Sequence, residues 1–168
     1  MDEVVAVVAQ ERRALEHLLF RLQHARDVLT ADDERFLSIA ADELEAAAAN
    51  VRELEAARAR VVATSGHDTL RSLVAAAPEP YQSILSEHHR ALGRLAGEVG
   101  ANLESTQELA EDRLAELRGE RPGRYRRSRR LRRVAPDELD QAIVAAGYES
   151  LLNVSSSVRL PALVSFLA

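Results

Sequence analysis

The chain has 168 residues, a net charge of −5 at neutral pH and no cysteine, which excludes a disulfide framework and a thiolate zinc site. Hydrophobic residues make up 46% of the sequence and aromatic residues only 4%; alanine and leucine, both strong helix formers, supply most of the apolar content. No segment approaches the roughly 18 apolar residues of a membrane span, and the acidic start, MDEVVAVVAQERR, is unlike a secretory signal. We therefore expect an all-α, cytoplasmic protein.

The first long helix is expected from about Glu3 to Leu29. Apolar residues recur along it at heptad spacing, which is typical of a coiled-coil-like seam. Glu11 interrupts this series at one core position. The predicted core positions are Val4, Val8, Leu15, Leu18, Leu22, Ala25 and Leu29.

A second long helix is expected to follow a short acidic stretch, with Thr30 or Asp32 as its cap, and to run to about Ala63. The short connection predicts that the first two helices form an antiparallel hairpin. Arg58 is interpreted as part of a solvated, charged face. The predicted core positions are Leu37, Ala40, Leu44, Ala47, Val51, Leu54 and Val61.

A short helix through Ala76 should come next, capped by Asp68 or Thr69, after Gly66 has ended the second helix. Two prolines stop it, and a third long helix is expected from about Tyr81 to Leu117. Its predicted apolar stripe is Leu92, Leu95, Val99, Leu103, Thr106, Ala110, Leu114 and Leu117.

Glycines inside the third helix require an explanation, because each destabilises an exposed helix by about 0.5–1 kcal/mol relative to alanine. They are Gly93, Gly97 and Gly100. Close packing of a neighbouring helix, or a bend, would account for them.

The sequence divides into a long-helix bundle (1–118), an Arg-rich flexible linker (119–134) and an amphipathic C-terminal segment (135–168). Residues 118–133, RGERPGRYRRSRRLRR, hold nine arginines and one glutamate, so the rest of the chain carries a net charge of −13. Arginines of this kind can bind nucleic acid phosphates. The acidic remainder would repel phosphate, so a nucleic-acid-associated protein is the less favoured hypothesis.

The C-terminal segment, VAPDELDQAIVAAGYESLLNVSSSVRLPALVSFLA, is too apolar for a solvated terminus. A helix should begin near Pro136, and Gly147 is expected to end or bend it. The segment must dock on its own chain or on a partner helix. We take its apolar side chains as the candidate partner-binding residues: Leu139, Ile143, Tyr148, Leu151, Leu152, Leu160, Leu163 and Phe166.

Signs of catalysis are missing from the sequence. There is no Gly-rich phosphate loop, no GxSxG elbow and no HExxH motif. His17 and His24 share one helix face, but a metal site there would need ligands from another helix. We therefore expect no enzymatic activity, no cofactor and no metal.

Three segments together resemble the FlgN-like family of flagellar export chaperones. They are the opening helix pair, ALEHLLFRLQHARDVLTADDERFLSIAADELEAAAANVRELEAARARVVA, the stretch VGANLESTQELAEDRL, and the ending AGYESLLNVSSSVRLPALVSFLA. The resemblance runs from about Ala14 to Phe166, and the ending is its most specific part. Ala162 stands where the family more typically has serine.

The resemblance implies a cytosolic chaperone of flagellar type III export. Such a chaperone binds hook–filament junction proteins, prevents their premature assembly and helps to deliver them to the export apparatus, without a cofactor. The main alternative is a structural coiled-coil protein that self-assembles, which the strict heptads favour. A homodimer is compatible with either hypothesis.

Overall fold

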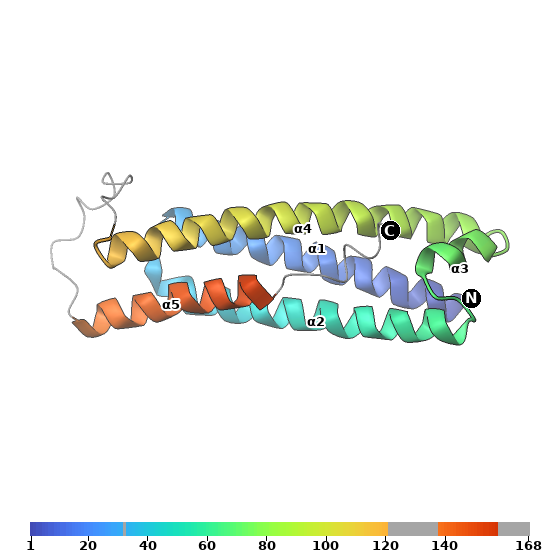
Figure 1. Cartoon of the computed structure of the whole chain (residues 1–168), viewed down its shortest axis with the longest axis horizontal. Coiled ribbons are helices and arrows are strands. Elements are labelled where there is room, and N and C mark those ends of the chain that lie inside the picture. Colours follow the sequence, from blue (N-terminus) through green and yellow to red (C-terminus); the bar gives the residue numbers. More distant parts are fainter. Residues whose placement is uncertain (32, 121–137, 158–168) are drawn as a thin grey trace. The chain divides into compact units, whose positions relative to one another are not determined.

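The computed structural model describes residues 1–31, 33–120 and 138–157, and within these ranges the regular elements are all helical. They are α1 (Asp2–Ala31), the 3₁₀-helix η1 (Glu34–Phe36), α2 (Leu37–Thr64), α3 (Leu70–Ala76), α4 (Tyr81–Leu117) and α5 (Glu138–Ser157), shown in Figure 1. The predicted all-α fold with several long helices is confirmed. Most of the predicted Arg-rich linker lies outside the described residues.

The helices form two compact units. The first comprises Met1–Phe20 and Ala46–Ala101, and the second comprises the described parts of Arg21–Glu45 and Asn102–Val158. The three long helices α1, α2 and α4 each contribute a segment to both units, whereas α3 belongs to the first and α5 to the second.

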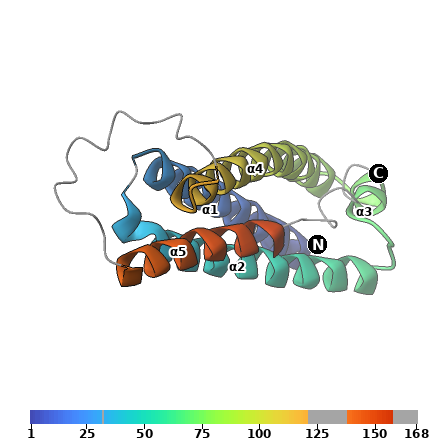
Figure 2. The ribbon, with the colours of Figure 1, turned by 60° about the vertical axis from the view of Figure 1, so that its left-hand side comes forward.

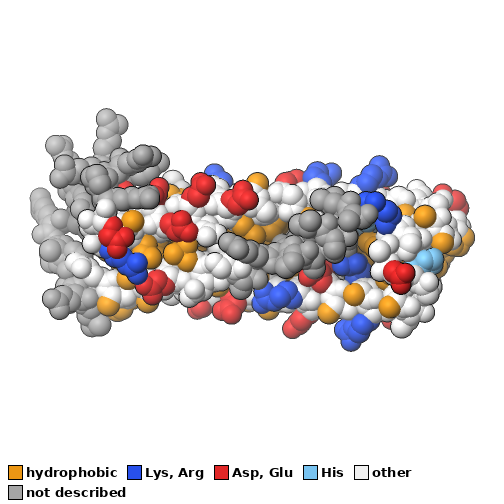
Figure 3. All heavy atoms as spheres, viewed as in Figure 1, with side chains coloured by type: hydrophobic (Ala, Val, Ile, Leu, Met, Phe, Trp, Pro, Cys, Tyr) orange, Lys and Arg blue, Asp and Glu red, His pale blue; other side chains and the backbone are white. Residues whose placement is uncertain are grey.

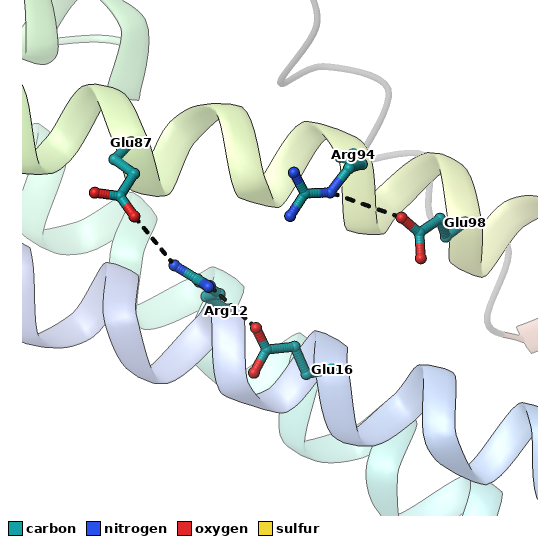
Figure 4. Close-up of polar contacts among 5 residues, drawn as sticks. All are labelled: Arg12, Glu16, Glu87, Arg94 and Glu98. Atoms are coloured by element: carbon teal, nitrogen blue, oxygen red, sulfur yellow. Dashed lines mark hydrogen bonds and ion pairs between the residues drawn. The ribbon is translucent and has the colours of Figure 1, made fainter.

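Polar contacts in the first unit join α1 to α4. The Tyr81 hydroxyl donates a hydrogen bond to the Asp2 carboxylate at 2.9 Å. Ten residues along α1, Arg12 lies between Glu16 of its own helix, at 3.0 Å, and Glu87 of α4, at 3.9 Å (Figure 4). Because both contacts advance along the two helices together, α1 and α4 run in the same direction in this unit.

In the second unit, α1 and α2 form a hairpin. The Arg21 guanidinium lies 2.7 Å from the Glu43 carboxylate, and the chain turns between these residues. The predicted antiparallel hairpin is therefore confirmed within this unit. The carboxylate of Asp33, in the turn, accepts two hydrogen bonds from Arg35, each 2.8 Å long.

The turn differs from the prediction in its capping. Thr30 lies in the last turn of α1, where its hydroxyl donates to the Arg26 carbonyl at 2.7 Å, so it does not cap α2. Asp32, the other predicted cap, lies outside the described residues. At the start of α3 the prediction is right: Thr69 accepts a hydrogen bond from the Ser72 backbone in a capping box.

The heptad positions form the core, as predicted. All seven core positions of α1 are buried, and so are the first five of α2. Near the end of α2, Val62 is buried while Leu54 and Val61 are only half-buried. Every position of the α4 stripe is buried except Leu117, which is half-buried.

Two glycines of α4 do not have the close neighbour that the sequence analysis expected. A Cβ atom at Gly97 or Gly100 would meet no heavy atom of the described residues within 4 Å. The close-packing explanation is therefore wrong for this pair within the described part of the chain. Gly66 and Gly119, by contrast, follow the ends of α2 and α4 with φ values of +80° and +75°, a left-handed conformation that favours glycine.

On the face shown in Figure 3, acidic and basic side chains are interspersed with apolar ones. Among the described residues, no helix has the length and apolar character that a membrane span requires.

Candidate partner-binding surface

The predicted partner-binding residues differ in their environments along α5. Tyr148 and Leu151 are buried, with 2% and 0% of their surface exposed, and Leu152 is half-buried. Ile143, in contrast, is 62% exposed. Leu139 is helical, but its side chain lies outside the described part. The remaining candidates, Leu160, Leu163 and Phe166, also lie outside the described residues.

Gly147 does not end α5. It was expected to end or bend the helix, but α5 continues ten residues beyond it, to Ser157. Its position is buried, and a Cβ atom there would lie 2.9 Å from the Cβ atom of Leu37 and 3.8 Å from the backbone nitrogen of Ser38. The glycine therefore allows α5 to approach the first turn of α2 closely; Figure 1 and Figure 2 both show the two helices side by side there.

One stripe of α5 is docked in the second unit. Its buried residues are spaced three or four apart, as one face of a helix requires, and they are Gly147, Tyr148, Leu151, Val154 and Ser155. Val154 and Ser155 were not among the predicted binding residues. The spacing of Gly147, Leu151 and Val154 at i, i+4 and i+7 was the signal in the sequence that could have found this stripe.

Ion pairing also joins α5 to the end of α4. The Arg118 guanidinium lies 2.7 Å from the Glu149 carboxylate, and each side chain is about half exposed. Such a solvated pair contributes at most about 1 kcal/mol. It orients α5 more than it stabilises it.

Apolar side chains remain exposed in the second unit beside the docked stripe. Phe36 is 45% exposed, with the Arg35 guanidinium 5.3 Å above its ring, and Ile39 is 51% exposed. The backbone of α5 lies against η1, which contains Phe36. The second unit thus combines a covered apolar stripe with exposed apolar side chains on η1, α2 and α5.

The first unit contains a buried ion pair that corrects a further interpretation. Arg58 does not belong to a solvated face: its side chain is 12% exposed, and its Nε lies 3.1 Å and 2.9 Å from the two carboxylate oxygens of Glu11. Burial raises the pKa of the Glu11 carboxyl to about 7, although Arg58 lowers it and Glu55 raises it further. Because Glu11 is fully buried, it has no surface through which to reach a substrate.

Within the described ranges, no group of three or more histidine, aspartate or glutamate side chains is arranged to hold a metal ion. Comparison of the chain with protein-family models, curated proteins and solved structures found no match.

Proposed function

We propose that this chain is a cytosolic chaperone of flagellar type III export, which binds hook–filament junction proteins, keeps them from assembling early and aids their export. The observation that carries the proposal is the C-terminal segment, which resembles the FlgN-like family and contains α5. This helix buries one apolar stripe while Ile143 remains 62% exposed. Junction proteins have amphipathic terminal helices, and an apolar surface with helical spacing suits such a client.

The docked state of α5 suggests how binding and release could be combined. A client helix needs an apolar surface, and α5 holds its own apolar stripe inside the second unit. A client that binds more tightly to the chain with α5 undocked would shift the population of the chain toward that state. Because export requires release of the client, the interface between chaperone and client need bury no more surface than a standard protein–protein interface, roughly 1,200–2,000 Å².

Client capture by exposed α5 side chains can be tested with two matched isoleucines. We expect Ile143→Ser to weaken co-purification with a hook–filament junction protein at least several-fold, since it removes an exposed apolar contact without opening the core. Ile84→Ser, at a partly exposed isoleucine of α4, is the control and should leave capture unchanged.

Deletion of residues 134–168 should abolish capture. Undiminished capture by the deleted chain would move the site to the long helices and contradict the proposal.

The competing function is a self-assembling coiled coil, which the heptads of α1 and α2 favour. All of those heptad positions except Leu54 and Val61 are buried in the core of a single chain, so self-assembly would have to use mainly another surface. Analytical ultracentrifugation of the purified chain tests this alternative. A large, stable oligomer would support the coiled-coil hypothesis, whereas a monomer or dimer agrees with the chaperone.

A further inference from the structure

The heptad series of α1 and α2 each contain one charged residue. In a coiled-coil-like seam, core positions are separated by alternating steps of three and four residues. Glu11 occupies one such position in the otherwise apolar series of α1. In α2 the alternation is unbroken from Leu37 to Val61 only when Arg58 is included. Both seams are therefore apolar except at one position, and the two exceptions carry opposite charges.

The two charged core residues meet inside the first unit. Glu11 is fully buried and the Arg58 side chain is 12% exposed, with its Nε 3.1 Å and 2.9 Å from the two carboxylate oxygens. Glu55, one turn before Arg58, is half-buried. Burial raises the pKa of both carboxyls, and Arg58 lowers both. Arg58 thus offsets the burial of two carboxyls, and its removal would leave both without this guanidinium.

The apolar positions alone do not determine how α1 and α2 are aligned. In the first unit the two helices run in opposite directions (Figure 1), and a shift of seven residues would set apolar positions against apolar positions again. The same shift would set Glu11 against the buried Val51, and Arg58 against Val4. A shift in the other sense would set Arg58 against Leu18. A buried charge without a partner is strongly unfavourable, so either shift is disfavoured by the charged pair.

We infer that Glu11 and Arg58 set the register of the first unit: they select one alignment of α1 with α2, and they prevent either seam from pairing with the same seam of a second chain. In a parallel pair of α1 helices Glu11 would face Glu11, and in a parallel pair of α2 helices Arg58 would face Arg58. Replacement of a buried ion pair by apolar residues is often neutral or stabilising, whereas one polar core position can fix the register and oligomeric state of a coiled coil. The pair therefore contributes selectivity more than stability, and this role requires no client.

Removal of both charges separates selectivity from stability. Glu11→Leu with Arg58→Leu in the full-length chain makes both seams apolar throughout and leaves the net charge unchanged. We expect the urea midpoint of this double variant to equal or exceed that of the wild type. Its self-association, measured by sedimentation equilibrium over a range of concentrations, should be at least tenfold tighter than that of the wild type, because like seams can then pair.

Cross-linking reports the alignment of the two helices directly. The chain has no cysteine, so Arg21→Cys with Glu43→Cys introduces the only thiols, at positions whose native side chains lie 2.7 Å apart. With Glu11 and Arg58 intact, a short bismaleimide should join these thiols within one chain. In the double leucine background the yield within one chain should fall by about half or more, and cross-linked dimers should appear, because α1 and α2 are no longer held in one alignment.

Two further variants distinguish pairing between helices from the mere burial of a polar group. Thr106 is fully buried, but its hydroxyl donates to the Asn102 carbonyl of its own helix at 2.7 Å. Thr106→Val is therefore the matched control and should leave association and cross-linking as in the wild type. Exchange of the charges, Glu11→Arg with Arg58→Glu, keeps an opposite pair. Each single reversal should lower the urea midpoint, and the exchange should recover part of that loss without added association.

The register-setting role would be overturned by a double leucine variant that keeps the association and the cross-linking yield of the wild type. A double leucine variant that unfolds at a lower urea concentration than the wild type would show that the pair acts through stability instead. Thr106→Val that associates as strongly as the double leucine variant would assign the effect to burial of any polar group. An exchange of charges that recovers none of the lost stability would show that Glu11 and Arg58 do not act as a pair.

Discussion

The two units bury charged side chains in different ways. In the first, the Glu11 carboxylate is paired with Arg58, and burial raises the pKa of the carboxyl to about 7. In the second, the charged group is Arg113 of α4, which is 8% exposed, lies 3.5 Å from the Glu116 carboxylate and donates to the Leu29 carbonyl in the last turn of α1 at 3.4 Å. A carboxyl can lose its charge near neutral pH, whereas a guanidinium cannot. Of these two buried groups, only the one in the first unit can change its charge near neutral pH.

Removal of the arginine in the first unit should have the largest effect. Arg58→Met leaves Glu11 buried without the guanidinium, and we expect a loss of about 3 kcal/mol in the free energy of unfolding at pH 8. The loss should be smaller at pH 5, where Glu11 is protonated. Urea unfolding of the variant and the wild type at pH 5 and pH 8 measures the loss at each pH. Arg60→Met, at an exposed arginine of the same helix, is the control and should change little; an equal loss in both variants would argue against the buried pair.

The wild-type chain itself should report the titration of Glu11. Its folded pKa of about 7 lies above the ordinary 4.5, so between these values the folded state binds more protons than the unfolded one. Stability from this group is therefore fully present below about pH 4.5 and declines as the pH rises to about 7, by an amount of the order of 3 kcal/mol. The measurement is the difference between wild-type and Glu11→Gln unfolding free energies from pH 4.5 to 8. A difference that stays constant with pH would contradict the raised pKa.

The buried arginine of the second unit provides the contrasting case. Arg113→Met removes the hydrogen bond to the Leu29 carbonyl, and we expect a loss of about 1–2 kcal/mol that is the same at pH 5 and pH 8. Thermal unfolding at both values tests this, with the exposed Arg94→Met as the control. A loss of stability at only one of the two pH values would contradict the expected difference between a buried carboxyl and a buried guanidinium.

Glycine substitutions should have the smallest effects, and their signs should differ between the units. Gly97→Ala in the first unit meets no described atom within 4 Å, so it should stabilise the chain by about 0.5–1 kcal/mol. Gly147→Ala in the second unit places its Cβ atom 2.9 Å from that of Leu37 and should instead weaken the docking of α5. Denaturant unfolding measures the first and hydrogen exchange of α5 the second. Stabilisation of α5 by alanine would show that the close approach to α2 is not required.

Prediction from sequence succeeded where the signal was periodic and local. Every core position that the heptads of α1 predicted is buried, and Pro80 and Gly119 bracket α4, whose predicted bounds were correct. It failed at Arg58, which was interpreted as solvated because its own surroundings in sequence are charged, while its partner lies 47 residues away. Gly147 was wrongly allowed as the end of α5, because a glycine that allows close helix packing looks the same in sequence as one that ends a helix.

The candidate surface was predicted only in part. Tyr148 and Leu151 were assigned to partner binding because they are apolar, yet they are buried within the second unit and Ile143 alone of the described candidates is largely exposed. Composition identified a segment that must dock, but it could not distinguish docking on the chain itself from docking on a partner.

The sequence by itself determined the all-α class, the long helices and the face that each turns to the core, because helix propensity and heptad spacing act over a few residues. Only the tertiary structure decided which charges are buried, where Gly147 meets Leu37 and which apolar residues of α5 are covered. Those outcomes depend on which distant segments pack together, because burial changes the energy of a charge or a hydroxyl far more than its neighbours in sequence do.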